Sequence, residues 1–199
     1  MQACVELLDA AGEDGLTVRA LTAHLVTGRG AIYHHVSGKD DMLAAATDAV
    51  IRDVVAAAAG DQDPAQALRL LALGIFDAID THPWVGTQLA RQPQPAVFRL
   101  WNGIGSLLDD FGVREADLSD AGSALVSYVL GASAQYAAGA RQALDADDRE
   151  EYLRQLAAQW AGNDSNPAPA GAAALVDHDD RDQFLAGVEI FLAGITVRR

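Results

Sequence analysis

Apolar residues recur at three- and four-residue spacings along nearly the whole chain, and no other feature of the sequence limits the fold so strongly. The segments that carry this spacing are rich in alanine and leucine, which favour helices. No stretch alternates apolar and polar residues with the valine, isoleucine and threonine content typical of strands. The sequence therefore predicts an all-α fold.

Capping residues, glycines and prolines divide this pattern into separate helices. Thr17 can cap one helix, and Asp63 followed by Pro64 is typical of the start of another. Gly12 and Gly60 are expected to end the helices before them. We expect a first helix that ends at residue 12, then helices over residues 17–25, 28–34, 39–59, 63–80, from 82 to the prolines at 93 and 95, 96–111, 119–143, 147–160 and 181–197. Residues 162–174 lack an apolar stripe, and we expect a mobile loop there.

The charge distribution singles out one window near the N-terminus. The chain has a formal net charge of -14, which disfavours non-specific binding to nucleic acid. Residues 16–39 nevertheless contain no aspartate or glutamate. The basic or titratable residues of this window are Arg19, His24, Arg29, His34, His35 and Lys39, the last of which is the only lysine in the chain. The window is a candidate DNA-binding surface, although a neutral surface stretch is the alternative.

Two short helices joined by a tight turn predict a helix-turn-helix in this same window. Residues 28–34 would form the recognition helix, where small residues allow close approach to base edges and Arg29 can contact guanine. Thr17, Tyr33, His35 and Lys39 can bind phosphates. The DNA-binding candidates are Thr17, Arg19, Thr27, Gly28, Arg29, Gly30, Ala31, Tyr33, His34, His35 and Lys39. A small three-helix cap in which Tyr33 is packed remains the alternative.

These residues resemble the tetracycline-repressor (TetR) family. The matching segments read Leu-Thr-Val-Arg-Ala-Leu at 16–21, Gly-Ala-Ile-Tyr-His-His-Val at 30–36 and Lys-Asp at 39–40. Weaker similarity to the tetracycline-repressor subgroup continues at 82–84, 128–131 and 184–189. The resemblance implies a homodimer, a palindromic double-stranded DNA operator and a small-molecule inducer. It also implies a DNA-binding domain over 1–45 and an effector-binding and dimerisation domain over 46–199.

Three positions depart from the family pattern. The chain starts at Met1, where family members usually carry another turn of the first helix. Val26 stands where the family usually has a glycine, and a β-branched residue tolerates positive φ poorly, so we expect Gly28 to take over part of the turn. Gln88 and Gln135 align with magnesium ligands of the tetracycline-responsive members. Neutral amides are poor ligands for this ion, which argues against a magnesium–tetracycline inducer.

Aromatic and polar residues in the C-terminal helices are candidates for effector binding. They are Phe76, His82, Trp84, Gln88, Phe98, Trp101, Asn102, Tyr128, Gln135 and Tyr136. Packing in the core is the alternative role for each of them. Because apolar residues dominate the set, we expect a hydrophobic, largely uncharged effector.

The apolar stripes of the helices over 119–143 and 181–197 predict the dimer interface. Gly131, Ala132, Gly187 and Gly194 would allow close approach there. The helix over 39–59 touches both domains and is a candidate lever between effector and DNA.

Other classes of protein fit less well. The acidic clusters near 145–151 and 177–182 lack the spacing of a metal site, and no nucleophile–base motif is present, so we expect no enzyme, metal or cofactor. Cys4 is expected to be a buried hydrophobe. Without a long apolar run or signal peptide, we expect a cytoplasmic protein with no membrane partner. A helical ligand- or partner-binding protein that has lost DNA binding is the remaining alternative.

Overall fold

The computed structural model describes residues 1–33, 36–59, 63–91, 94–145, 149–161 and 179–196, which form helices without any strand. The all-α prediction is therefore confirmed. The helices are α1 (Gln2–Gly15), α2 (Val18–His24), α3 (Arg29–Tyr33), α4 (Lys39–Ala58), α5 (Pro64–Thr81), α6 (Pro83–Leu89), α7 (Pro95–Asp110), α8 (Glu115–Asp145), α9 (Arg149–Ala161) and α11 (Asp180–Thr196).

The helix boundaries follow the capping residues closely. Asp63 caps α5 by accepting a hydrogen bond from the backbone amide of Gln66 at 3.2 Å, and Pro64 occupies the first turn. The prediction that the first helix ends at Gly12 is wrong, because α1 continues to Gly15. Gly12 (φ 65°, ψ −170°) produces a kink inside the helix. The expected loop at 162–174 lies outside the described residues.

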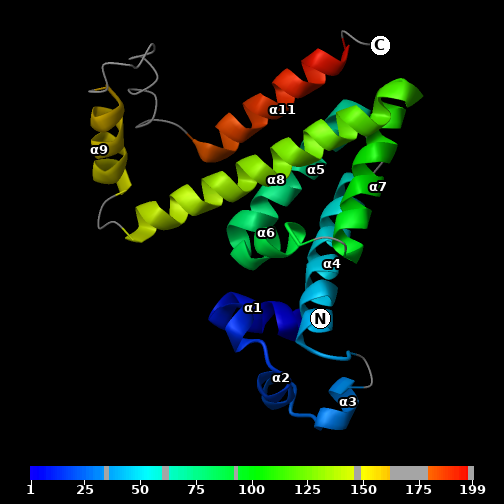
Figure 1. The fold of residues 1–199 in the computed structure, drawn as a ribbon, viewed down its shortest axis with the longest axis vertical. Helices are drawn as coiled ribbons and strands as arrows, with labels where there is room; N and C mark the ends of the chain where they lie inside the picture. Colours follow the sequence, from blue (N-terminus) through cyan, green and yellow to red (C-terminus); the bar gives the residue numbers. More distant parts are fainter. Residues whose placement is uncertain (34–35, 60–62, 92–93, 146–148, 162–178, 197–199) are drawn as a thin grey trace.

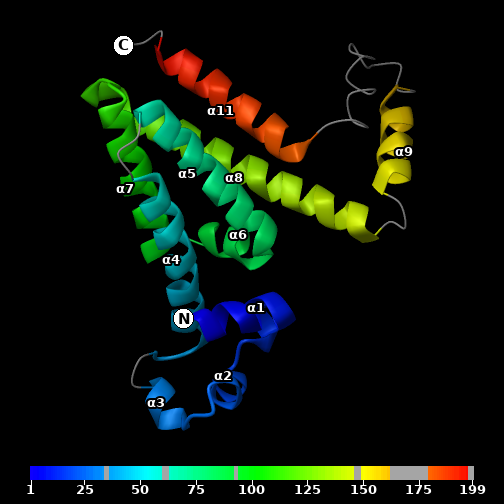
Figure 2. The same cartoon turned by 180° about the vertical axis from the view of Figure 1, so that it is seen from behind.

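The described helices form two bodies joined by α4 (Figures 1 and 2). Helices α1, α2 and α3 cluster around the first turn of α4 at one end of the molecule. The rest of α4 extends into the larger body, where it packs against α5 and α7. Helix α8 crosses this body, α11 runs beside α5 and α8, and α9 lies past the far end of α8. The proposed domain boundary at residue 45 falls within α4, so the two bodies share this helix.

One apolar core continues from the small body into the larger one. Leu8 of α1, Leu21 of α2 and Leu43 of α4 belong to the same buried cluster as Ile75 of α5 and Leu125 of α8. Because α4 contributes buried residues along its length, a shift of this helix must repack side chains in both bodies. Cys4 lies in this core at 2% exposure, as expected for a small hydrophobe, and burial raises the pKa of its thiol.

Ion pairs tie the helices of the larger body together at its surface. The Arg99 guanidinium of α7 donates to both carboxylate oxygens of Asp48 on α4, at 2.9 and 3.0 Å. Arg69 of α5 pairs with Glu189 of α11, and this guanidinium lowers the pKa of the Glu189 carboxyl. These contacts fix α4 against α7 and α11 against α5.

Candidate DNA-binding and effector sites

The two short helices α2 and α3 have the connection expected for a helix-turn-helix. Thr17 caps α2, because its side chain accepts a hydrogen bond from the amide of Ala20 at 3.0 Å. The hydroxyl hydrogen of Thr17 is not used in that bond, and the residue is exposed. Thr17 can therefore still donate to a phosphate.

The turn between these helices places an unfavourable backbone angle on Val26. The amide of Thr27 donates to the carbonyl of Thr22 at 3.1 Å, and that of Val26 donates to Ala23 at 3.4 Å. This pair of bonds forms a Schellman motif, which requires a left-handed residue at Val26. Val26 has φ 50° and is 91% exposed. The expectation that Gly28 shares this role is wrong, since the end of α2 determines which residue is left-handed.

The predicted DNA-binding residues that can be described lie at the surface of the small body. Arg19, Thr27, Gly28, Gly30, Ala31 and Lys39 are all exposed. A Cβ atom added at Gly28 or Gly30 would meet nothing within 4 Å. The chain around Gly28 and Gly30 therefore leaves room for a partner surface. His34, His35 and the side chains of Arg29 and Tyr33 lie outside the described part of the structure, so their roles stay predictions.

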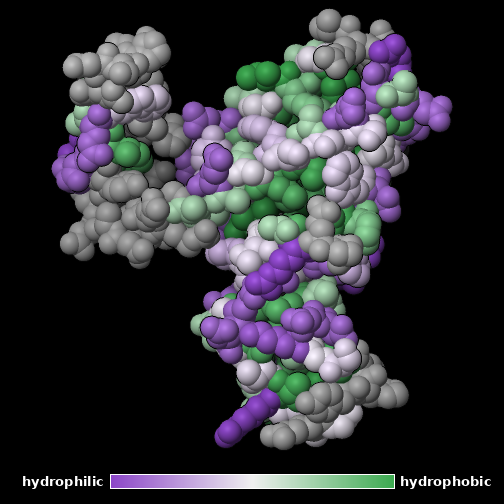
Figure 3. Space-filling model, in the orientation of Figure 1, coloured by the Kyte–Doolittle hydropathy of each residue, from purple (hydrophilic) through white to green (hydrophobic). Residues whose placement is uncertain are grey.

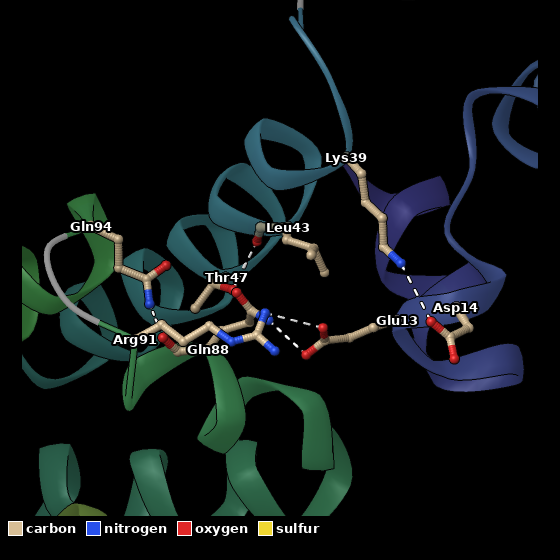
Figure 4. A network of polar contacts seen from close by, with 8 residues as sticks. All are labelled: Glu13, Asp14, Lys39, Leu43, Thr47, Gln88, Arg91 and Gln94. Atoms are coloured by element: carbon tan, nitrogen blue, oxygen red, sulfur yellow. Dashed lines mark hydrogen bonds and ion pairs between the residues drawn. The ribbon is translucent and has the colours of Figure 1, made fainter.

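Carboxylates of α1 reach a histidine and the lysine of the acid-free window. Glu6 Oε2 lies 2.8 Å from His24 Nε2, and Asp14 Oδ1 lies 3.6 Å from Lys39 Nζ. Figure 4 shows the second pair between the N-terminus of α4 and the end of α1. The window lacks acids in sequence but has acids beside it in the fold.

Two other carboxylates of α1 face the larger body. Asp9 Oδ1 accepts a hydrogen bond from Trp84 Nε1 at 2.8 Å and lies 2.7 Å from His82 Nδ1. The second carboxylate, that of Glu13, is shown in Figure 4, where it accepts from Gln88 Nε2 at 2.7 Å and from Arg91 Nη1 at 3.1 Å. We call this set the α1–α6 latch; it consists of Asp9, Glu13, His82, Trp84, Gln88 and Arg91.

The latch changes the interpretation of three effector candidates. Trp84 and Gln88 are buried, and both donate to α1. Gln94 secures Gln88 further by donating to its backbone carbonyl. His82, Trp84 and Gln88 therefore connect the two bodies in this structure. No local sequence pattern indicates that these three residues connect the two bodies, because the acids that they contact lie 73 to 75 residues earlier in the chain.

A second group of effector candidates packs together as an aromatic cluster between α5, α8 and α11. Phe76 contacts Tyr136 at a centroid distance of 5.9 Å and Phe184 at 4.8 Å. Tyr128 stacks on Phe184 at 5.5 Å, and its hydroxyl donates to the Phe184 carbonyl at 2.8 Å. Burial raises the pKa of both tyrosine hydroxyls. Phe184 was expected only in the dimer stripe, yet it holds this cluster together.

The remaining effector candidates are dispersed. Trp101 is half-buried beside Gly122, whereas Phe98 is 56% exposed and Gln135 is also exposed. Asn102 lines a cleft of about 760 Å³ between α4, α5 and α7, whose apolar wall includes Val55 and Leu71. The ten candidates thus occupy the latch, the aromatic cluster, the α7 surface and the exposed side of α8.

A separate apolar groove lies where the start of α8 meets the end of α11. It has a volume of about 410 Å³, and Ala121, Ala124, Phe191 and Ile195 line it. Ile190 stands at this groove with 75% of its surface exposed. Figure 3 shows hydrophobic side chains at the surface over α8 and α11. Gly187 lies against Tyr128 of its own chain, and its expected place at the dimer contact stays a prediction.

The described residues form neither a metal-binding cluster nor a membrane-spanning helix. Among the residues that the structure describes, no group of three or more histidine, cysteine, aspartate or glutamate side chains is placed to hold a metal ion. None of the helices within the described ranges is long and apolar enough to cross a membrane.

Comparison with known proteins identifies relatives of both bodies. Residues 1–46 match the family model "Bacterial regulatory proteins, tetR family", and residues 57–199 match "Tetracyclin repressor-like, C-terminal domain". The transcriptional regulator SCO7222, a TetR from Streptomyces coelicolor, is 45% identical with a TM-score of 0.85, and the match covers 98% of this chain and 95% of that one.

Two curated proteins are also similar. An HTH-type transcriptional regulator of Saccharopolyspora erythraea is 28% identical over 98% of this chain and 82% of its own. The HTH-type transcriptional repressor DrrR1 of Streptomyces coeruleorubidus is 29% identical over 67% of this chain and 50% of its own. These relatives are regulators of transcription and not enzymes.

The strain at Val26 can be measured. Val26→Gly removes the Cβ atom that opposes φ 50°, and we predict that it raises the free energy of unfolding by about 0.5–1 kcal/mol, after the entropy cost of glycine. Ala23→Gly in α2 is the control, which should lower it by about the same amount because its φ is helical. Denaturant titration at fixed protein concentration measures both. A Val26→Gly variant less stable than the parent would contradict the assignment.

The close contact between Gly187 and Tyr128 in the aromatic cluster can be tested by substitution. A Cβ atom at Gly187 would lie 1.9 Å from Tyr128 Oη, so Gly187→Ala must displace the ring and its hydrogen bond. We expect a loss of about 1–3 kcal/mol of stability. Gly105→Ala in α7, where nothing lies within 4 Å, should leave stability unchanged or raise it by up to about 1 kcal/mol. Equal effects of the two substitutions in thermal unfolding would show that Tyr128 does not occupy this space.

Proposed function

Because the chain belongs to the tetR family of bacterial regulatory proteins, we propose that it is a repressor that binds a palindromic operator as a homodimer and releases it when a small-molecule effector binds. The observation that carries this proposal is the α1–α6 latch, which joins the helix-turn-helix body to the larger body. Through the latch, a change in the larger body can alter the position of the DNA-binding helices.

Contacts with DNA would come from the exposed side of α2, α3 and the start of α4. Gly28 and Gly30 leave space for base edges, and Arg29 would supply a bidentate contact to guanine. Thr17 and Lys39 would bind phosphates on either side of the recognition helix and fix its register.

Dimerisation would cover the apolar groove between α8 and α11. Ile190 and the groove residue Phe191 expose apolar surface that a second copy would remove from water. A two-fold axis through this face would present two recognition helices to half-sites about one helical turn of DNA apart.

The effector would enter the cleft between α4, α5 and α7. Its volume of about 760 Å³ lies within the range of small-molecule sites, and Asn102 and Ser106 offer hydrogen bonds beside apolar walls. An amphipathic molecule fits this lining, which also contains Asp110 and the Arg99 side chain that is paired with Asp48. Widening the cleft would strain the Arg99–Asp48 pair and move α4, which reaches directly into the small body. The aromatic cluster is the other candidate effector site, but its rings would first have to separate.

A second candidate function is a ligand-binding protein with weakened DNA binding. The net charge of -14 and the pairing of His24 and Lys39 with α1 carboxylates favour it. Salt-dependent binding to DNA separates the two functions, because a repressor must bind its operator more tightly than unrelated duplexes.

Gel-shift titrations with DNA from upstream of the protein's own gene test the repressor proposal. We expect sequence-specific binding that weakens with salt. Arg29→Ala should reduce the preference for the operator by about 1–3 kcal/mol, whereas Lys39→Ala should weaken binding to all sequences and reduce the salt slope by about 1. Arg154→Ala on α9 is the control and should change neither. Equal affinity for the upstream DNA and for scrambled duplexes would contradict the proposal.

A further inference from the structure

The acid-free window of the sequence is not free of acids in the fold. Residues 16–39 contain no aspartate or glutamate, but α1 places Glu6 against His24 and Asp14 against Lys39. His24 lies at the end of α2 and Lys39 at the start of α4, on either side of the recognition helix in the chain. Lys39, which would meet a DNA phosphate, already has a carboxylate partner, and a second carboxylate lies at the end of α2.

We propose that Glu6 and Asp14 are built-in competitors of the DNA phosphates, so that α1 lowers the affinity of the helix-turn-helix for DNA. This inference rests on the proposed function. It adds two residues that determine affinity without touching a base.

The geometry of the two pairs indicates competition and not structural support. The Asp14 side chain is fully exposed, and its oxygen is 3.6 Å from Lys39 Nζ, so a phosphate can replace it. Glu6 and His24 are also about half-exposed. Exposed ion pairs of this kind add little to stability. Asp9 and Glu13 on the same helix differ, because their side chains are less exposed and accept hydrogen bonds from residues of the larger body.

The Asp14 carboxylate weakens the binding of a phosphate at Lys39. A phosphate bound at Lys39 must share the ammonium with Asp14 or displace it, and the displaced carboxylate stays close to the phosphate. Repulsion in water between the bound phosphate and the nearby carboxylate reduces the affinity for DNA about two- to threefold for each carboxylate at low salt. The effect should fade above a few hundred millimolar salt, where screening acts over a few ångströms.

The test compares charge-neutral variants of the full chain in binding to a 30-base-pair duplex of random sequence. We expect Glu6→Gln combined with Asp14→Asn to bind about four- to ninefold more tightly at 50 mM salt, with a steeper salt dependence and little difference at 300 mM. Asp14→Asn alone should give part of the gain, and its exposed side chain makes misfolding no concern. The random duplex measures the charge effect without requiring the operator.

The control is Asp109→Asn combined with Glu115→Gln, at the end of α7 and the start of α8, far from the small body (Figure 1). It changes the net charge equally and should alter affinity less than twofold. An equal gain in the control, or no gain in the Glu6 and Asp14 variant while the parent binds DNA, would overturn the inference and leave the repressor proposal standing. Failure of the parent and every variant to bind either this duplex or upstream DNA would overturn both.

Discussion

Hydrogen bonds to α1 carboxylates link the small body to the larger one, in addition to the shared helix α4 and the continuous apolar core. Asp9 and Glu13 bind His82, Trp84, Gln88 and Arg91 of the larger body, while Glu6 and Asp14 lie against His24 and Lys39 of the smaller body. Helix α1 has no lysine or arginine. All of the partners named above lie on other elements. Any displacement of α6 therefore acts on a helix that also adjoins the DNA-binding surface.

The apolar pattern and the caps were enough to predict most of the fold. Periodicity, together with Thr17, Asp63 and the prolines that start α5, α6 and α7, located the helices because these signals act within a few residues. Val26 shows where local signals fall short. Its left-handed backbone follows from the two hydrogen bonds that end α2, which the sequence does not reveal.

The candidate sites were less predictable for a physical reason. The chemistry of Trp84, Gln88 and His82 suggested a ligand, but composition cannot tell which neighbour a helix face meets. Their hydrogen-bonding groups are taken by α1 in this structure. Gly187 likewise fits a close contact, as expected, but the partner is Tyr128 of the same chain. The cleft beside Asn102 depends on how α4, α5 and α7 pack, and no short motif encodes that.

Hydrogen exchange of Asp9→Ala combined with Glu13→Ala tests most directly whether the latch holds the small body to the larger one. Loss of hydrogen bonds to charged groups, worth about 1.5–3 kcal/mol each, should speed amide exchange in α1 and α6 by tenfold or more. Exchange in α8 should not change. Glu6→Ala combined with Asp14→Ala removes the same charge from the same helix without touching α6, and should leave α6 protected. Unchanged protection of α6 in the Asp9 and Glu13 variant would contradict the account.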